Sequence, residues 1–144
     1  GIYDARALSG AKVAVHQLDA CGLENTKDSL ADMFSVSQNT FKPDVLINDG
    51  DVINVGDIAV KVIHTPGHTC GSCCYYIKEE DVLISGDTLF CQSVGRSDFP
   101  TGSMSTLVHS IREKLFCLPD DTMVYPGHNE VTCIADEKMY NPFI

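Results

Sequence analysis

Basic residues are scarce in this chain. Of its 144 residues only 10 are Lys or Arg, against 20 Asp or Glu, which gives a formal net charge of -10. Such an acidic chain repels phosphate backbones and has no basic stripe to bind them, so we expect no nucleic-acid partner. No apolar run reaches about 20 residues, the length of a membrane-spanning helix, so we also expect a soluble protein with no membrane partner.

A signal-peptide pattern and an even set of cysteines are lacking as well. The seven cysteines favour free thiols in a reducing compartment over a disulfide framework, so we expect a cytoplasmic protein. The chain opens at Gly1 without an initiator Met. The segment GIYDARALSGAKV is typical of the end of a helix, a C-cap at Gly10 and then a strand. We therefore expect that the natural protein begins earlier.

The chain does contain enough apolar sequence for one folded domain. Hydrophobic residues make up 44% of it and charged residues 21%, as in ordinary soluble proteins. Residues 1–144 contain no repeat, low-complexity tract or Pro/Ser-rich linker that would mark a boundary. The sequence predicts a single domain over 1–144.

Short β-rich runs dominate the first two thirds of the chain. Tight turns are predicted at Asp49-Gly50 and Gly56-Asp57, and a helix over 26–34. The predicted strands are 13–16, three runs within 44–64, 72–78 and 81–85.

Helices are predicted mainly near the C-terminus. From Ser103, a suitable N-cap, apolar residues recur at helical spacing until Pro119, which predicts an amphipathic helix. A strand over 122–125 and a helix over 131–139 follow. Helices segregated from a sheet of short strands indicate an α/β or α+β layered fold, although this pattern does not choose between topologies.

Three polar residues come directly after predicted strands, in loops that contain glycine. They are His68 in HTPGHT, Asp87 in SGDTLF and His128 in VYPGHN. Two imidazoles and a carboxylate are sufficient ligands for a catalytic Zn²⁺ or non-haem iron ion with open positions. Each residue alone could equally cap a helix or complete a turn. The three together favour a metal site.

The segments around these residues carry a family resemblance. KVIHTPGHTCGSCCYYI, LISGDTLFCQSVGRSDFPTGS and MVYPGHNEVT resemble, in order and spacing, three signature segments of metallo-β-lactamase-fold hydrolases. The ending EKMYNPFI is similar to the small glyoxalase II-like, or hydroxyacylglutathione hydrolase-like, members. The resemblance implies an αββα sandwich with a mixed sheet, flanking helices and a dinuclear metal site at one edge. It implies that His68 binds the first metal, Asp87 bridges the two and acts in catalysis, and His128 binds the second.

The HxHxDH motif of that family is absent from this chain. The five histidines are His16, His64, His68, His109 and His128, and no two have the required spacing. By the resemblance the motif would lie just before Gly1, and His64 matches a position that is not usually a ligand. We therefore expect the second half of the sandwich, an N-terminally incomplete domain. It should self-associate or pair with the missing N-terminal half through an exposed sheet face.

The segment GRSDFPTGS follows Asp87, where the resemblance places residues that hold an acidic thioester substrate. Arg96 would pair with a substrate carboxylate, or equally with Asp98 to brace the loop. Phe99 would line the pocket, or pack within the loop. The cysteines of CGSCC could serve redox or metal chemistry, but Cys73 and Cys74 lie in an apolar strand, where a thiol is usually a small buried hydrophobe.

The resemblance implies a hydrolase of thioesters or esters that uses a metal-bound hydroxide, with zinc, or iron or manganese, at two ions per intact domain. With three ligands, this chain alone should bind metal weakly and be inactive. One alternative is a persulfide dioxygenase-like enzyme with a single iron, which carries a similar GR-D-F segment. Another is a non-catalytic fragment that self-associates. β-Lactamase activity is disfavoured, because no export signal accompanies the cysteine-rich chain.

Overall fold

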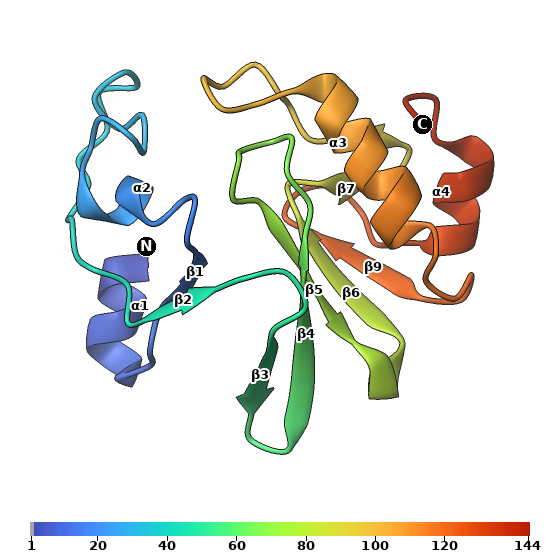
Figure 1. Ribbon diagram of the computed structural model, residues 1–144, viewed down its shortest axis with the longest axis horizontal. Helices are drawn as coiled ribbons and strands as arrows, with labels where there is room; N and C mark the ends of the chain where they lie inside the picture. Colours follow the sequence, from blue (N-terminus) through green and yellow to red (C-terminus); the bar gives the residue numbers. More distant parts are fainter. Residues whose placement is uncertain (1) are drawn as a thin grey trace. The chain divides into compact units, whose positions relative to one another are not determined.

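Alternating apolar residues build the central sheet of the protein, which a computed structural model describes over residues 2–144 (Figure 1). Six strands lie in the order β10-β9-β6-β5-β4-β3. The neighbouring pairs are antiparallel except β6 and β9, which are parallel. A parallel pair needs a long crossover, and here the crossover contains helix α3. The sheet is therefore mixed, as predicted.

Five of the six strands agree with the predicted runs, whereas β10 lies where the sequence predicted a helix. The six strands are β3 (Val52–Val55), β4 (Ile58–His64), β5 (Cys73–Ile77), β6 (Val82–Gly86), β9 (Met123–Pro126) and β10 (Thr132–Cys133). A 3-10 turn, η1 (Lys78–Glu80), joins β5 to β6, and the hairpin of β7 (Leu89–Phe90) and β8 (Ser93–Val94) follows β6. The predicted turns are present, with positive φ at Gly50 and Gly56.

The amphipathic helix begins where the sequence predicted. Helix α3 (Met104–Ser110) has Ser103 as N-cap, whose Oγ accepts a hydrogen bond from the Thr106 backbone N–H at 3.3 Å. It continues as a π-helical segment, η2 (Ile111–Leu115), which periodicity did not predict. Helix α4 (Ile134–Tyr140) starts later than predicted because β10 pairs with β9. Over residues 2–144 no helix is both long and apolar enough to span a bilayer.

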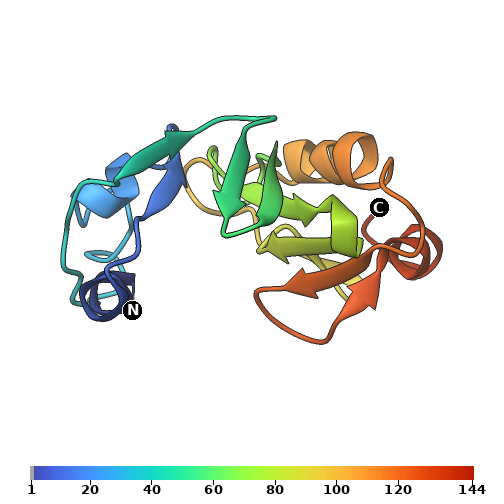
Figure 2. The same cartoon turned by 90° about the horizontal axis from the view of Figure 1, so that it is seen from below.

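The hydrophobic core lies between these helices and one face of the sheet (Figures 1 and 2). Leu107, Ile111 and Leu115 are fully buried against that face. The opposite face carries a cross-strand row of Val62, Tyr75, Ile84 and Tyr125. Ile84 and Tyr125 are each 45% exposed, so this face presents apolar side chains to solvent.

A buried carboxylate anchors helix α4 to the β7–β8 hairpin. Glu137 is 1% exposed, and its oxygens accept hydrogen bonds from the Gln92 backbone N–H and the Thr132 hydroxyl. The Asn141 amide donates both to Glu137 and to the Ser93 carbonyl. Because buried carboxylates are tolerated when hydrogen-bonded, this arrangement fixes the hairpin that follows Asp87.

Residues up to Ile47 form a separate compact unit, and Asn48–Ile144 form the unit described above. The first unit contains α1 (Ile2–Ser9), β1 (Ala14–His16), α2 (Cys21–Glu24) and β2 (Val45–Ile47), with β1 parallel to β2. Gly10 ends α1 with a φ of 68°, and its N–H donates to the Arg6 carbonyl. The strand, the helix end and the C-cap agree with the predictions.

The helix predicted over 26–34 is wrong. That segment is a series of turns, and the only helix nearby among the described residues is the single turn α2. Asn25 is extended directly after α2, and Leu30 has a φ of 63°, which is incompatible with a continuous right-handed helix. The Asn25 side chain accepts a hydrogen bond from the Asp28 backbone N–H and stabilises a turn instead.

Candidate metal centre

The three predicted ligands come from strand ends that share one edge of the sheet. Asp87 follows β6 and His128 lies two residues beyond β9. Because β6 and β9 are parallel neighbours, their carboxyl ends lie side by side, and the Gly127 N–H donates to the Gly86 carbonyl at 2.8 Å. His68 lies in the loop between β4 and β5, and β4 runs in the same direction as β6. The topology therefore brings the three side chains together.

The carboxylate of Asp87 lies between the two imidazoles. Asp87 Oδ2 is 3.6 Å from His68 Nε2, and Asp87 Oδ1 is 3.4 Å from His128 Nε2. Each imidazole thus faces a different oxygen. Over residues 2–144 no three His, Cys, Asp or Glu side chains converge on one point as the ligands of a single ion would. The arrangement resembles the central part of a two-ion site, and the ligand roles stay a prediction.

The hydrogen bond at the other ring nitrogen sets the tautomer of His68. Its Nδ1 lies 2.8 Å from the backbone carbonyl oxygen of Arg96. A carbonyl only accepts, so Nδ1 carries the proton and Nε2 presents its lone pair toward Asp87. Phe99 packs edge-on against the same imidazole, with ring centroids 5.1 Å apart. A backbone carbonyl in this position is a usual partner of a metal-binding histidine.

Two glycines allow the loops to approach Asp87. A Cβ on Gly127 would lie 2.7 Å from Asp87 Oδ1. A Cβ on Gly95 would lie 1.8 Å from the Asp87 carbonyl oxygen. Any larger residue at either position would have to displace Asp87 or its loop, so the glycines of VYPGHN and SVGRS serve close packing.

A buried polar layer fixes the loops from within the core, and sequence reasoning missed it. Thr65 Oγ1 lies 3.1 Å from Thr88 Oγ1 and 3.4 Å from Cys74 Sγ. The Ser85 hydroxyl donates to the Leu89 carbonyl at 2.7 Å. Thr65, Thr88 and Ser85 lie in apolar runs or motif loops, where a hydroxyl gives no periodic signal in the sequence. Burial raises the pKa of Cys74 to about 11, so this thiol stays protonated.

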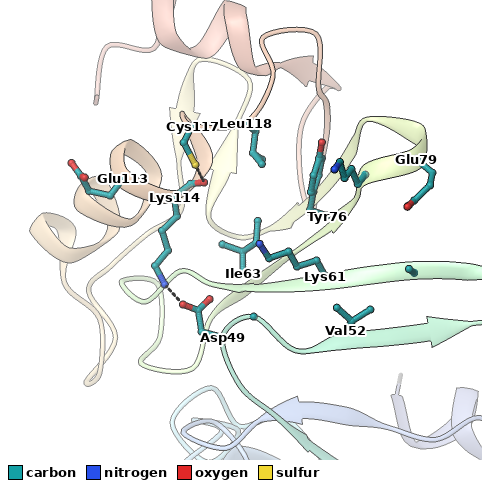
Figure 3. Close-up of a pocket in the computed structure, with 13 residues that line it drawn as sticks. Asp49, Val52, Lys61, Ile63, Tyr76, Glu79, Glu113, Lys114, Cys117 and Leu118 are labelled. Carbon is teal, nitrogen blue, oxygen red and sulfur yellow. Dashed lines mark hydrogen bonds and ion pairs between the residues drawn. The ribbon is translucent and has the colours of Figure 1, made fainter.

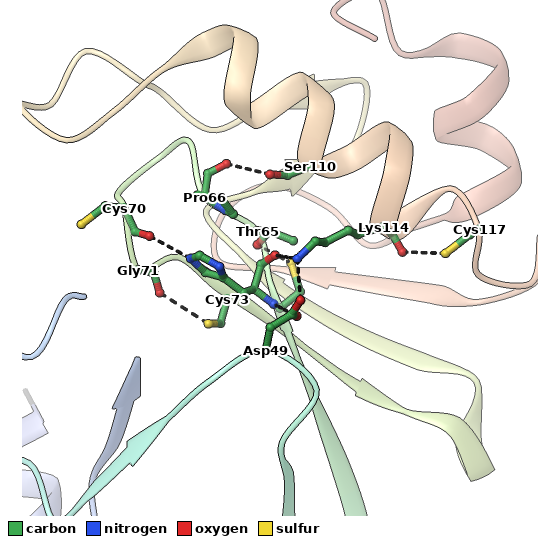
Figure 4. A network of polar contacts seen from close by, with 11 residues as sticks. Asp49, Thr65, Pro66, Cys70, Gly71, Cys73, Ser110, Lys114 and Cys117 are labelled. Carbon is green, nitrogen blue, oxygen red and sulfur yellow. Dashed lines mark hydrogen bonds and ion pairs between the residues drawn. The ribbon is translucent and has the colours of Figure 1, made fainter. Parts of the chain in front are cut away.

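A second network holds the loop that carries His68 to helix α3 and segment η2 (Figure 4). The Ser110 hydroxyl donates to the Pro66 carbonyl, and Lys114 Nζ donates to the His64 carbonyl. Asp49 accepts from Lys114 Nζ and from the His64 backbone N–H, each at 2.7 Å. Partial burial opposes ionisation of Asp49, but these hydrogen bonds outweigh it and lower its pKa.

His64 has a structural contact, in agreement with its omission from the predicted ligands. Its Nε2 lies 2.8 Å from the Cys70 carbonyl, to which it donates. The Cys73 thiol donates to the Gly71 carbonyl, also within this loop. All seven cysteines are free thiols. His16 ends β1 and His109 lies on α3, as the sequence predicted.

The Arg96 side chain is paired with Asp98. Arg96 Nε and Nη2 each donate to one oxygen of Asp98 at 2.7 Å, and the guanidinium lies over the Phe99 ring at 4.6 Å. The hydrogen bonds from Arg96 lower the pKa of Asp98 to about 2. Of the two contacts weighed for Arg96, the structure contains the internal one. A role of Arg96 and Phe99 in substrate binding stays a prediction.

A cavity lies away from these residues (Figure 3). It has a volume of about 530 Å³ and lies between β3, β4 and η2, where Ile63, Lys61 and Lys114 line it. None of the predicted site residues lines this cavity. Three lysines and three acidic residues line it, so its charge does not indicate a ligand.

The donor set around Asp87 fits divalent metal ions. Imidazole and carboxylate are the preferred ligands of zinc and non-haem iron. The Nε2 lone pair of His68 points at the bridging position, and the site is open to solvent on the side of His128, whose side chain is 71% exposed. The residue types present therefore fit a metal ion, with Asp87 next to both imidazoles.

Comparisons with known proteins identify the family. A family model described as the metallo-beta-lactamase superfamily matches residues 1–128. The chain is 40% identical over 129 residues to the probable metallo-hydrolase YqgX of Bacillus subtilis, covering 84% of this chain and 61% of that protein. It is 39% identical over 107 residues to the hydroxyacylglutathione hydrolase GloC of Haemophilus influenzae, covering 74% and 50%. It is 37% identical over 103 residues to the human mitochondrial persulfide dioxygenase ETHE1, covering 69% and 41%.

Solved structures agree with this family. The crystal structure of the B3 metallo-beta-lactamase BLEG-1 superposes with a TM-score of 0.91 at 35% identity, covering 99% of this chain and 69% of that one. TTHA1623 in a di-iron-bound form superposes with a TM-score of 0.85 at 30% identity, covering 99% and 70%. The mixed sheet with flanking helices is thus the metallo-β-lactamase fold, as predicted.

The chain belongs to the metallo-beta-lactamase superfamily, a group of metal-binding hydrolases and related enzymes. It spans about half the length of the curated relatives that it matches. The predicted family is confirmed. Thioester hydrolysis and zinc are finer assignments that belong to the proposal below.

Proposed function

We propose that this chain supplies the bridging part of a dinuclear metal centre in a glyoxalase II-like thioester hydrolase. The observation that supports it is the position of Asp87, whose two oxygens face Nε2 of His68 and Nε2 of His128. A carboxylate placed in this way is suited to hold two cations at a fixed separation. The resemblance to the hydroxyacylglutathione hydrolase GloC supports the choice of a thioester.

Each residue has a defined part in this proposal. Bound cations would polarise the thioester carbonyl and lower the pKa of water toward neutrality. Asp87 would hold a cation with each of its oxygens, and the His68 Nδ1–H bond to the Arg96 carbonyl would orient the His68 ring. Phe99 and the Arg96 guanidinium border the approach to His68 and would contact the substrate. Zinc is the proposed metal, with iron or manganese as alternatives.

Three ligands alone would bind metal weakly. Catalytic zinc sites use three protein ligands for one ion, whereas His68, Asp87 and His128 would be shared between two. We therefore propose that this chain alone binds at most one ion loosely and is inactive toward thioesters. A polypeptide that carries an HxHxDH segment would complete the centre, and pairing would use the exposed sheet face.

The test combines intact mass, metal content and calorimetric zinc titration of the purified chain. Single variants His68→Ala, Asp87→Asn and His128→Ala are titrated beside it. We expect weak zinc binding that each variant reduces about 10-fold or more, because each removes a donor. Hydrolysis of S-lactoylglutathione is then measured for the chain alone and after addition of a polypeptide that carries HxHxDH.

His109→Ala is the matched control, because it removes an exposed histidine on α3. It should leave zinc binding unchanged. Zinc binding by His68→Ala, Asp87→Asn and His128→Ala that is as tight as that of the unchanged chain would contradict the proposed centre. Hydrolysis that never appears with the complementing polypeptide, despite two bound ions per complex, would contradict the proposed reaction.

A persulfide dioxygenase-like activity is the second candidate. The similarity to human ETHE1 favours it, together with the Gly95–Phe99 segment beside His68. The di-iron form of TTHA1623 shows that a structural neighbour accepts iron. Oxygen uptake by the iron-loaded, complemented protein with glutathione persulfide, in the absence of thioester hydrolysis, would favour this activity over the first.

A further inference from the structure

The loop that follows the β7–β8 hairpin is arranged around an internal carboxylate. Asp98 accepts two parallel hydrogen bonds from Arg96, through Nε and Nη2, both at 2.7 Å. This is the bidentate geometry with which a guanidinium recognises a free carboxylate. The Nε–Nη2 edge of Arg96, one of the two edges with which a guanidinium can bind a carboxylate, is therefore occupied by a residue of the chain itself.

The same pair lies next to the candidate metal centre. Phe99 lies between the Arg96 guanidinium, 4.6 Å from its ring, and the His68 imidazole, 5.1 Å away. The Arg96 carbonyl accepts the His68 Nδ1 proton. An anionic group that displaced Asp98 from Arg96 would thus bind beside Phe99, the residue that packs against His68.

Both side chains are accessible to a ligand. The side chains of Arg96 and Asp98 are 56% and 68% exposed. Solvent weakens such a pair, so an external carboxylate can compete for the guanidinium. The charges of Arg96 and Asp98 also cancel. Asp98 therefore removes the long-range attraction that Arg96 alone would exert on an anion.

We propose that Asp98 is a specificity-determining residue that masks Arg96 and disfavours substrates with a free carboxylate beside the reacting sulfur. This inference rests on the proposed function for the identity of the substrate as a thioester. The preferred thiol carrier is then one that is neutral near the thioester. Replacement of Asp98 by a neutral residue unmasks Arg96 and shifts preference toward carboxylate-bearing carriers.

The test is a binding measurement that needs neither metal nor turnover. The probes are N-acetyl-S-methylcysteine, which has a free carboxylate, and its N-methylamide, which is otherwise identical but neutral. Their dissociation constants are measured by NMR titration that follows the backbone amide resonances of residues 95–99. We expect Asp98→Asn and Asp98→Ala to bind the carboxylate probe about fivefold more tightly than the unchanged chain. Binding of the amide should not change.

Two further variants make the result specific. Asp57→Asn makes the same change of charge in the exposed β3–β4 turn and should bind both probes like the unchanged chain. Arg96→Gln combined with Asp98→Asn should lose the gain. Equal carboxylate affinity with and without Asp98, or an equal gain for the amide, would overturn the inference.

The outcomes separate this inference from the proposed function. In one outcome, Asp98→Asn binds the carboxylate probe more tightly while the complemented protein hydrolyses no thioester. That result would support the masking of Arg96 and contradict the proposed reaction. Thioester hydrolysis with an unchanged carboxylate affinity in Asp98→Asn would do the reverse.

Discussion

At the scale of single residues, the candidate centre depends on how closely backbone and side chain can approach. Asp87 has the Gly127 backbone against Oδ1 and the Gly95 backbone against its own carbonyl. His68 is oriented by one carbonyl and one aromatic edge. The positions of these donors are thus fixed by residues that donate nothing to a metal themselves.

Gly127→Ala is expected to weaken metal binding more than folding. The added Cβ would lie 2.7 Å from Asp87 Oδ1 and 3.3 Å from the Gly86 backbone, so the carboxylate must move. We expect zinc affinity to fall about 10-fold, as when a ligand loses its orientation. Calorimetric titration measures this, with thermal unfolding as the check on folding.

Gly22→Ala is the control for that substitution. A Cβ at Gly22 would meet the Ser29 backbone only at 3.8 Å, an ordinary contact, and Gly22 lies in the first unit. It should leave zinc affinity unchanged. If Gly127→Ala bound zinc as tightly as the unchanged chain, Asp87 Oδ1 would not be a ligand atom.

The placement of these residues was predictable, but their supports were not. Their positions in glycine-containing loops after predicted strands, and the resemblance of the segments around them, indicated that His68, Asp87 and His128 belong to one site. The hydroxyls of Thr65 and Thr88 gave no signal, because two residues 23 positions apart meet only through the fold. Sequence reasoning left two partners open for Arg96, and only coordinates showed that Asp98 occupies it.

At the scale of elements, helix α3 and segment η2 position the loop that carries His68. Ser110 and Lys114 donate to carbonyls of Pro66 and His64. The change to π-helical turns at Ile111 lies between these two donors. Such turns are frequent at functional sites, and the sequence does not encode them in a periodicity that can be recognised.

Elements with a strong apolar periodicity were predicted correctly, whereas the segment 26–34, whose conformation depends on local hydrogen bonds, was not. Strands β4 to β6 and helix α3 follow apolar patterns that a core imposes. The segment 26–34 has helix-forming composition, but Leu30 at positive φ and the Asn25 turn prevent a helix. Local side-chain hydrogen bonds outweighed propensity there.

The Lys114–Asp49 contact is expected to make stability depend on pH. The pKa of Asp49 in the folded chain lies below its ordinary value, so its contribution is present above the unfolded pKa and is lost as pH falls through the folded value. Lys114→Met removes the donor that lowers this pKa. The difference in Tm between the unchanged chain and Lys114→Met should therefore shrink from pH 6 to pH 3.

Calorimetric or circular-dichroism melts at these two pH values measure the effect. Lys138→Met is the matched control, because it removes the same kind of lysine–aspartate contact from Asp120, whose side chain is 71% exposed. Its difference in Tm should change less between the two pH values. A Lys114→Met difference that grows toward pH 3 would contradict the assigned sign.

At the scale of the whole molecule, helices cover one face of the sheet, and the other face is buried at Val62 but exposed on strands β6 and β9. Helices α3 and α4 cover the face of Ile63, Tyr76 and Val124. On the other face Ile84 and Tyr125 are each 45% exposed, and Met123 in the neighbouring row is 41% exposed. Exposed apolar surface of this kind usually marks an interface. The sequence predicted an exposed sheet face only because the HxHxDH motif is missing.

We expect this face to drive self-association of the isolated chain. Stacked sheets pack about 10 Å apart, and a stable interface buries roughly 800 Å² on each partner, which one face of a six-stranded sheet can supply. Ile84→Lys places a charge at the centre of the cross-strand row, and burying it unpaired would cost several kcal/mol. Sedimentation velocity should show dimers or larger species for the unchanged chain and monomers for Ile84→Lys.

Met139→Lys tests whether association depends on this sheet face or on any exposed apolar side chain. Met139 is 71% exposed on α4, so the substitution makes the same chemical change on a helix rather than on the exposed sheet face. It should leave association unchanged. If the unchanged chain sedimented as a monomer, or if both lysine variants dissociated equally, the sheet face would not be the interface. If only Ile84→Lys dissociates, the same variant should also fail to pair with the complementing HxHxDH polypeptide, since both partners would compete for one apolar surface.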